Sequence, residues 1–349
     1  MNKLSSAPIQ SSRRNVIRCL YTIALIAAAL AFAVTIAGIS YQTFEAKADA
    51  RRFHQEGKSV DVGGYKLNIN CTGQGSPTVI LESGLEVPAI GWRFVQPDVS
   101  KFTRVCSYDR AGYAWSDSGP FPRTHAQIVQ ELHTLLRNAR ETPPYILVGH
   151  SFGTTNVRIC NGLYPNEVVG MVLAEGGPDD LKFPASILKL SLDNLKERQR
   201  NRTFALIRFT LGISRYLVRK KIENPASSHG AQEWWYDSIQ PKFVAATTTE
   251  VENIFNEDGA NDLKRAGTLG DKPLIVLIAG KGMWGLPLVS QDWVDLRKMW
   301  VDGQMRLAQQ LTSRGKWLIV SDSAHMIPYE RPDAIVSAVR EIYASVSLQ

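Results

Sequence analysis

Tyr145-Ile146-Leu147-Val148-Gly149-His150-Ser151-Phe152-Gly153 is the stretch of the chain that decides its fold. An apolar run leads into a serine between two glycines, and a helical pattern follows over residues 154–163. This order predicts a buried strand that turns sharply into a helix, with Ser151 at the apex of the turn. Glycine suits both flanking positions because so tight a turn leaves little room for side chains. The structural alternative is a glycine-rich turn that carries an ordinary serine.

Strands and helices alternate on both sides of this turn. Besides the strand before Ser151, strands are predicted over residues 59–62, 65–71, 78–81, 102–108, 168–174, 274–279 and 316–320. Helices are predicted over residues 124–140, 296–313 and 332–346. The Gly63-Gly64 pair between the first two strands predicts a hairpin. Such alternation is typical of an α/β fold, in which helices cover both faces of a mostly parallel sheet.

Residues 177–267 interrupt this alternation. They lack clear strands and show helical patterns over residues 187–200, 204–221 and 234–255. We interpret them as a helical cap inserted into a core formed by residues 59–176 and 268–349. The basic residues of the cap helices indicate either a solvated face or a surface that rests on anionic lipid headgroups.

The charge of the chain is concentrated near its N-terminus. The 349 residues carry a net charge of +7, and the first 60, with eight basic and three acidic residues, account for +5 of it. The remaining +2 gives no indication of nucleic-acid binding. None of the four cysteines has the spacing of a zinc site or a Cys-x-x-Cys redox pair.

Residues 19–44 contain no charged side chain, and residues 20–39 are dense in apolar ones. A helix of about 20 apolar residues crosses a bilayer, whereas a signal peptide has a shorter apolar region of about 7–15 residues. We therefore predict a transmembrane signal-anchor helix over residues 19–41, then a linker over residues 42–58. Cleavage near Ala46-Lys47-Ala48 and a buried core helix are the alternatives.

The basic residues before this helix predict its orientation. Arg13, Arg14 and Arg18 precede the apolar run, which favours a cytoplasmic segment over residues 1–18. A competing cluster after the run, Lys47 with Arg51 and Arg52, is diluted by acidic residues. The rest of this single-pass chain would then lie in the periplasm or outside the cell.

A serine hydroxyl needs a base before it becomes a good nucleophile. His325 follows the final predicted strand, and strand ends at the carboxyl edge of a parallel sheet converge on one site. We therefore expect His325 to be the base. The alternative is a loop histidine at the entry to a helix. His150 lies inside the turn itself, so its side chain is not expected to reach back to Ser151.

These motifs resemble the α/β-hydrolase superfamily. The resemblance rests on residues 146–153, on Tyr108-Asp109-Arg110-Ala111-Gly112 and on the late His325, and it extends from about residue 60 to 347. It implies an eight-stranded sheet, a Ser-acid-His triad and an oxyanion hole. By the same comparison, the amides of Leu85 and Phe152 would form that oxyanion hole, and Asp109-Arg110 would be a structural turn pair.

The acid of the triad departs from the commonest pattern of the superfamily. Most relatives place an aspartate after the penultimate strand, but here no carboxylate follows that strand until Asp292. Some relatives place the acid one strand earlier, where this chain has Glu175. Glu175 ends an apolar strand, where a buried carboxylate needs a partner such as the N–H of His325. We favour Glu175 over Asp292 and Asp179; a salt-bridged glutamate at the cap hinge is the alternative.

A serine rather than an aspartate at position 151 points to an acyl-enzyme and hence to a carboxylesterase-like hydrolase of small acyl compounds. Neither a metal nor an organic cofactor is needed. An aminopeptidase or amidase on the same triad is the runner-up, with Asp179, Asp180 and Glu233 as candidates for an amine pocket. A non-catalytic binding module is the third alternative. Trp234 and Trp284 are expected to line the substrate pocket or to pack in the core.

In the fold that the resemblance implies, the strands that carry Cys71 and Cys106 are neighbours. An exoplasmic location permits oxidation, so a disulfide is one prediction and two buried thiols are the other.

Overall fold

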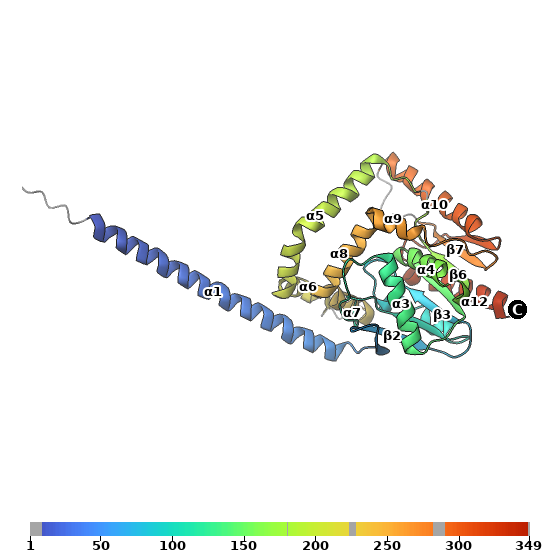
Figure 1. Cartoon of the computed structure of the whole chain (residues 1–349), viewed down its shortest axis with the longest axis horizontal. Coiled ribbons are helices and arrows are strands. Elements are labelled where there is room, and N and C mark those ends of the chain that lie inside the picture. Colours follow the sequence, from blue (N-terminus) through green and yellow to red (C-terminus); the bar gives the residue numbers. More distant parts are fainter. Residues whose placement is uncertain (1–8, 180, 223–227, 282–289, 348–349) are drawn as a thin grey trace, which may run out of the picture.

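The computed structural model describes residues 9–179, 181–222, 228–281 and 290–347. Its centre is an eight-stranded sheet in the order β1-β2-β4-β3-β5-β6-β7-β8 (Figure 1). All neighbouring strands are parallel except β2, which is antiparallel to both β1 and β4. The predicted mostly parallel α/β sheet is thus confirmed. The strands are β1 (Lys58–Asp61), β2 (Lys66–Thr72), β3 (Thr78–Glu82), β4 (Val105–Tyr108), β5 (Tyr145–His150), β6 (Val168–Ala174), β7 (Leu274–Ala279) and β8 (Gly315–Val320).

The central strands are apolar on both faces because helices cover both faces. Leu147 of β5 packs in one core cluster with α3 (His125–Ala139), α4 (Phe152–Leu163) and α10 (Gln291–Leu311). Its neighbour Val148 belongs to the opposite cluster, which α2 (Gln96–Val99) and α12 (Pro332–Ser347) complete. Consecutive residues of a strand point to opposite faces, so both must be apolar here. The short helix α11 (Ile327–Glu330) follows β8 and leads into α12.

Helices of the cap connect β6 to β7. They are α5 (Ala185–Thr210), α6 (Ile213–Ile222), α7 (His229–Ser238), α8 (Pro241–Phe255) and α9 (Glu257–Leu263). The predicted break between residues 200 and 204 is wrong, because α5 continues to a turn at Gly212, whose φ of +69° suits glycine. The single helix predicted over residues 234–255 is also wrong. Pro241 begins a new helix there, as expected of a residue that cannot continue one.

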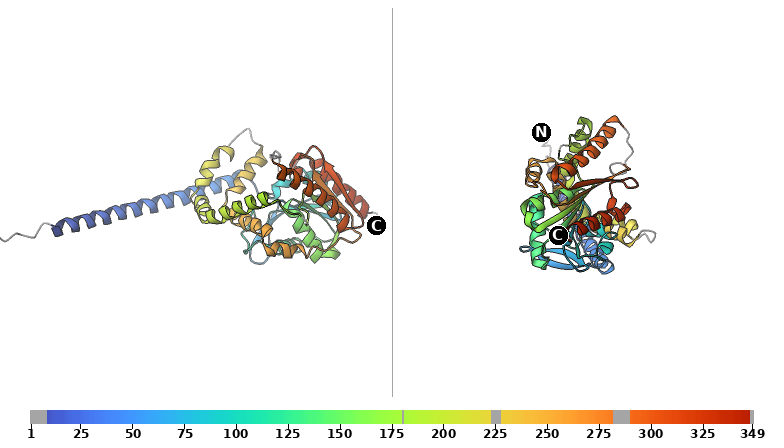
Figure 2. Two further views of the ribbon diagram at one scale, coloured as in Figure 1. Left: turned by 90° about the horizontal axis from the view of Figure 1, so that it is seen from above. Right: turned by 90° about the vertical axis from the view of Figure 1, so that its right-hand side faces the viewer.

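A long N-terminal helix, α1 (Ile9–Arg52), projects from the rest of the protein (Figures 1 and 2). Its apolar part is long and apolar enough to cross a membrane and is not buried against the protein. The helix continues beyond the membrane span predicted over residues 19–41. Residues 42–52, expected to be a linker, contain good helix formers and neither glycine nor proline, so the helix continues through them.

Cys71 and Cys106 lie directly opposite each other in the antiparallel pair β2–β4, and a disulfide joins them. Of the two predictions made for this pair, the structure has the disulfide rather than two thiols. Glu141 lies close to both sulfur atoms, but a disulfide leaves neither of them as a thiolate to bind a metal. Cys19 and Cys160 are free thiols.

Candidate active site

Ser151 occupies the turn between β5 and α4. Its backbone is strained, with φ of +52° and ψ of −120°, and its amide donates to the carbonyl of Ala174 at 2.9 Å. A Cβ atom on Gly149 would lie 2.7 Å from the carbonyl oxygen of Gly153, and one on Gly153 would meet the carbonyl oxygens of Glu82 and Ser83. Both glycines are therefore required sterically, and the turn presents the Ser151 hydroxyl at the carboxyl edge of the sheet.

His325 lies in the loop after β8, and its Nε2 atom is 2.9 Å from Oγ of Ser151. His150 holds this loop in position through a hydrogen bond to its backbone. Burial, together with the nearby imidazole of His325, lowers the pKa of His150 to about 3. The neutral His150 ring can therefore donate its Nε2–H to the carbonyl of His325, at 2.8 Å. The sequence alone predicts no such role for His150.

Glu175 directly follows β6 and is fully buried, with a left-handed φ of +54°. Its Oε2 atom lies 3.3 Å from Nδ1 of His325 and accepts from Nε1 of Trp300 at 3.1 Å. The Oε1 atom accepts from the amide of Ala279 at 2.7 Å and from Nε2 of Gln304 at 3.3 Å. Four donors thus compensate for the burial of one carboxylate, and they aim it at the imidazole.

The other acids considered from the sequence have different partners. Asp292 lies at the start of α10 and accepts from the hydroxyl of Ser186. Asp179 makes two hydrogen bonds of 2.6 Å with Arg158. Of the acids considered, Glu175 is therefore the one that contacts His325, which in turn contacts Ser151.

The two expected oxyanion donors lie in the same cavity as Ser151. Phe152 is the first residue of α4, so its amide has no acceptor within the helix. Leu85 lies in the loop after β3, and both residues line the cavity beside Ser151 and His325.

Arg110 holds the loop that carries Leu85. Its guanidinium donates to the carbonyls of Ser83 at 2.7 Å and Gly84 at 2.8 Å. It also pairs with Glu82 at 3.0 Å and with Glu250 of cap helix α8 at 3.1 Å. The expectation that Arg110 is structural agrees with these contacts. Neither Glu82 nor Glu250 is among the residues predicted from the sequence. The position of Glu82 at the end of a buried apolar strand is the one local feature that could have indicated it.

A cavity of about 1150 Å³ opens above Ser151 and His325 and reaches under the cap. Trp234 lies in its wall, where the indole N–H donates to the carbonyl of Glu86 at 3.2 Å. Trp284, the other tryptophan expected there, lies outside the described residues. The remaining wall is largely apolar and includes Leu181, Phe183, Trp235, Phe255, Leu263 and Trp300. The site can thus accept an apolar group beside a serine–histidine pair.

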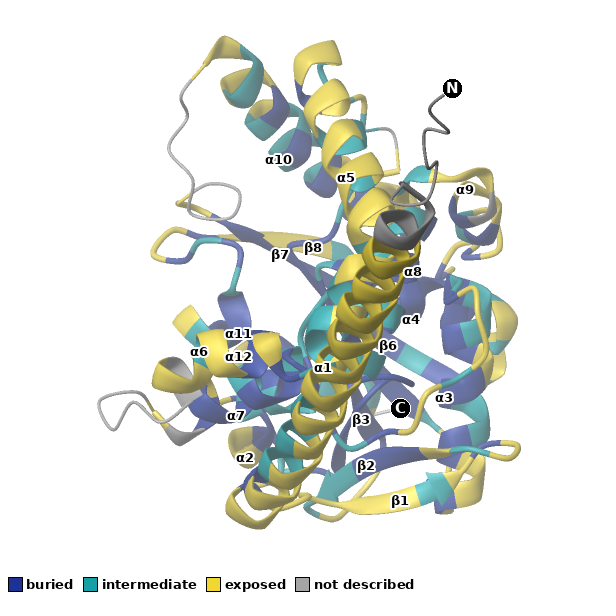
Figure 3. Ribbon diagram, turned by 90° about the vertical axis from the view of Figure 1, so that its left-hand side faces the viewer, coloured by how far each residue is buried: buried dark blue, intermediate teal, exposed yellow. Residues whose placement is uncertain are grey.

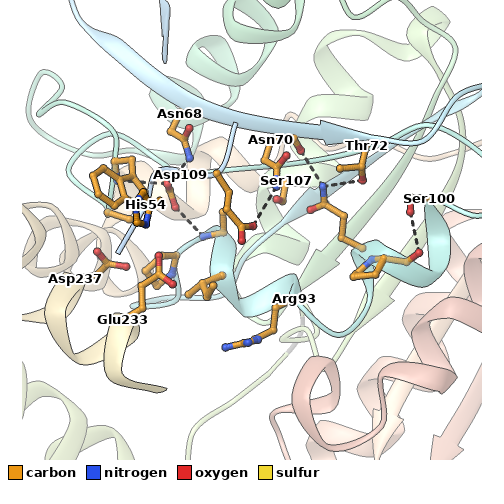
Figure 4. A pocket seen from close by; sticks show the side chains of 18 residues that line it. His54, Asn68, Asn70, Thr72, Arg93, Ser100, Ser107, Asp109, Glu233 and Asp237 are labelled. Atoms are coloured by element: carbon orange, nitrogen blue, oxygen red, sulfur yellow. Dashed lines mark hydrogen bonds between the residues drawn. The ribbon is translucent and has the colours of Figure 1, made fainter. Parts of the chain in front are cut away.

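A second cavity, of about 550 Å³, has mostly polar or charged residues in its lining and is not lined by Ser151 or His325 (Figure 4). Asp109 lies in its wall and accepts from Nδ2 of Asn68 at 2.9 Å and from the amide of Ala89 at 2.8 Å. These bonds agree with the expected structural role of Asp109. Two further acids face this cavity from α7, and burial raises the pKa of Glu233 to about 7 and that of Asp237 well above its ordinary value.

Comparisons with known proteins agree with this fold. The sequence profile of the alpha/beta hydrolase family matches residues 83–338. The uncharacterized protein YbdG of Bacillus subtilis is 25% identical over 253 residues, 70% of this chain and 72% of that protein. A 2-hydroxymuconate semialdehyde hydrolase of a Pseudomonas strain is 24% identical over 257 residues, covering 71% of this chain and 86% of the enzyme.

Among solved structures, the epoxide hydrolase CorEH superposes with a TM-score of 0.64 at 17% identity, covering 83% of this chain and 98% of that one. At this identity the likeness concerns the fold alone. The family profile, by contrast, covers well over half of the sequence and includes both Ser151 and His325. The chain therefore belongs to the α/β-hydrolase family.

Proposed function

We propose that the protein is a serine hydrolase that cleaves carboxylic esters through an acyl-enzyme on Ser151. The observation that carries this proposal is the contact of 2.9 Å between Oγ of Ser151 and Nε2 of His325, with Glu175 behind the imidazole at 3.3 Å. A hydroxyl beside an oriented imidazole is the arrangement that activates a serine.

The proposed reaction begins when Ser151 attacks the ester carbonyl and His325 takes the hydroxyl proton at Nε2. Glu175 then stabilises the imidazolium through its Nδ1–H, while the amides of Leu85 and Phe152 bind the oxyanion. His325 returns the proton to the departing alcohol, which leaves the acyl group on Ser151. A water molecule, deprotonated by His325, attacks this acyl-enzyme and releases the carboxylic acid.

The contacts of the acidic cap residues favour an ester over an amine-bearing peptide. Asp179 lines the cavity above Ser151, but its carboxylate is already paired with Arg158, and Glu233 lines the second cavity instead. Asp180 lies outside the described residues. The largely apolar wall around Trp234 and Phe255 suits an uncharged acyl or alcohol group instead.

A panel of p-nitrophenyl esters of graded acyl length, set against amino-acid anilides, tests this proposal. We expect turnover of the esters and none above background by the Ser151→Ala variant. Preference for the anilides would make the protein an amidase. No turnover of any substrate, by protein that still unfolds cooperatively, would favour a binding module.

We further propose that α1 anchors the protein in a membrane with its N-terminus in the cytoplasm. The apolar helix and the preceding basic residues support this orientation, and a disulfide is typical of an oxidising compartment. Alkaline phosphatase fused after Gln349 should be active in a bacterial host. Activity of a cytoplasmic reporter at the same position would reverse the orientation.

A further inference from the structure

The turn between α5 and α6 contacts α1 close to the end of its apolar run. We call residues 204–217 the cap elbow. A Cβ atom on Gly38 of α1 would lie 2.8 Å from the carbonyl oxygen of Leu211, and one on Gly212 would lie 2.7 Å from the ring of Tyr41. Glycine on each side thus lets the elbow pack directly against the helix, as small residues do where helices approach closely.

Polar and aromatic contacts continue this attachment toward the body of the protein. Nε of Arg215 donates to Oε1 of Gln42 at 3.0 Å, and the same guanidinium pairs with Asp49, where both side chains are buried. Phe53, just after α1, stacks on Tyr236 of α7 with ring centroids 5.5 Å apart. The packing at Gly38 and Gly212 and the contacts of Arg215 therefore fix the position of the cap elbow along α1.

This attachment sets the depth of the cap elbow relative to a bilayer that surrounds α1. A helix rises 1.5 Å per residue, so Gly38 lies only about 10 Å before Glu45, the first charged residue after the apolar run. A bilayer core needs about 20 apolar residues, which residues 20–39 supply. The elbow therefore meets α1 at the boundary between hydrocarbon and headgroups.

The cap elbow exposes large apolar side chains at positions where a protein surface in contact with water would usually carry polar ones. Phe204 of α5 is 62% exposed, and on α6 Tyr216 is 70% and Leu217 63% exposed. Ile207 and Ile213 are exposed beside them. The spacing of three or four residues places the members of each helix on one face. Figure 1 shows α5 and α6 on the side from which α1 projects, and Figure 3 shows how exposed α5 is when seen from that side.

Basic residues surround this apolar face. Residues 196–221 contain nine basic residues and one acidic residue, and of the basic ones Arg215 is buried against Asp49 and Arg198 pairs with Glu86. Aromatic and aliphatic side chains among lysines and arginines are typical of helices that lie in a membrane interface rich in anionic lipid. The charge near the elbow thus complements the headgroups at the depth where α1 places it.

We propose that the cap elbow is a second membrane-contact element, seated in the headgroup region of the bilayer that α1 crosses. This inference rests on the proposed anchoring by α1. A single span leaves a protein free to tilt about its anchor, whereas a second contact fixes the cap, and the cavity beneath it, relative to the lipid surface.

Spin labels in the full chain, reconstituted into vesicles of phosphatidylcholine and phosphatidylglycerol, test the proposal. Labels are placed by Leu217→Cys and, separately, by Phe204→Cys in a Cys19→Ala background, in which the disulfide and the burial of Cys160 protect the remaining cysteines. Collisions with oxygen, which concentrates in lipid, are compared with collisions with a water-soluble nickel chelate. Both labels should give a several-fold higher ratio of oxygen to nickel collisions than a label in water.

Two further labels distinguish a failure of the elbow proposal from a failure of the anchor proposal on which it rests. Ala28→Cys reports the middle of α1, and Ser337→Cys reports the exposed face of α12, at the opposite end of the protein (Figure 1). A lipid-like signal at position 28 with water-like signals at both 204 and 217 would overturn the elbow and leave the anchor standing. A water-like signal at position 28 would overturn the anchor, and the elbow with it.

Discussion

Oε2 of Glu175 lies 3.3 Å from Nδ1 of His325, although 150 residues separate the two along the chain. The contact joins the end of β6 to the loop after β8, on either side of β7. The amide of Ala279, which ends β7, donates to the other oxygen of the same carboxylate. The geometry of three adjacent strand ends therefore determines how His325 is presented to Ser151.

Replacement of Glu175 by Gln should lower kcat for ester hydrolysis by about 10⁴-fold, the loss seen when a triad acid becomes an amide. The amide can donate to Nδ1 and so favour the wrong imidazole tautomer. Asp292→Asn is the matched control, because Asp292 bonds Ser186 instead, and it should leave kcat near the wild-type value. A collapse of kcat in Asp292→Asn with activity retained in Glu175→Gln would reassign the acid.

Loss of the Arg110 guanidinium should strongly destabilise the protein. Arg110→Met leaves the buried carboxylates of Glu82 and Glu250 without their cation, which should lower the free energy of unfolding by about 3–5 kcal/mol. Urea denaturation in detergent measures the change. Arg331→Met, which breaks an exposed pair with Asp333, should leave the free energy of unfolding nearly unchanged. Equal effects of the two substitutions would contradict this account of Arg110.

The disulfide should account for a measurable part of the stability. It joins residues 35 apart, so replacing both Cys71 and Cys106 by Ala should lower the free energy of unfolding by about 4 kcal/mol. Cys19→Ala, at an exposed free thiol, should change nothing. In the denatured chain, two thiols should react before reduction and four after it. Four reactive thiols before reduction would show that the bridge is absent.

Glu233 should make the protein less stable as pH rises. Its pKa is raised from 4.5 to about 7 on folding, so between these values the folded state binds more protons than the unfolded state. The free energy of unfolding then decreases with rising pH across this window. Glu233→Gln removes this dependence. Between about pH 5 and about pH 8, the melting temperature of the variant should therefore rise relative to that of the wild type. A constant difference would contradict the raised pKa.

Local patterns were sufficient to predict most of the core. The apolar run before Ser151 and the Gly63-Gly64 pair specify a buried strand and a hairpin through short-range sterics, and both are present. The resemblance, rather than spacing, indicated Glu175, which lies in contact with His325. Two of its other donors, Trp300 and Gln304, come from α10 more than 100 residues away and leave no local signal.

Long-range contacts explain what the sequence did not reveal. Residues 42–52 look like a polar linker, yet they form a helix, and Asp49 within it pairs with Arg215 of the cap. Glu250 could not be linked to Arg110 from the sequence, because the pair spans 140 positions. Polar residues that find partners across the fold look like ordinary surface residues when only the sequence is read.

Mass spectrometry of the protein after reaction with a fluorophosphonate tests the central proposal most directly. The reagent reacts with a serine only when a neighbouring base activates it. We expect one phosphonyl adduct per chain, located on Ser151, with none in Ser151→Ala and much slower labelling in His325→Gln. Intact, folded protein that stays unlabelled at Ser151 would contradict the assignment of an activated nucleophile to this turn.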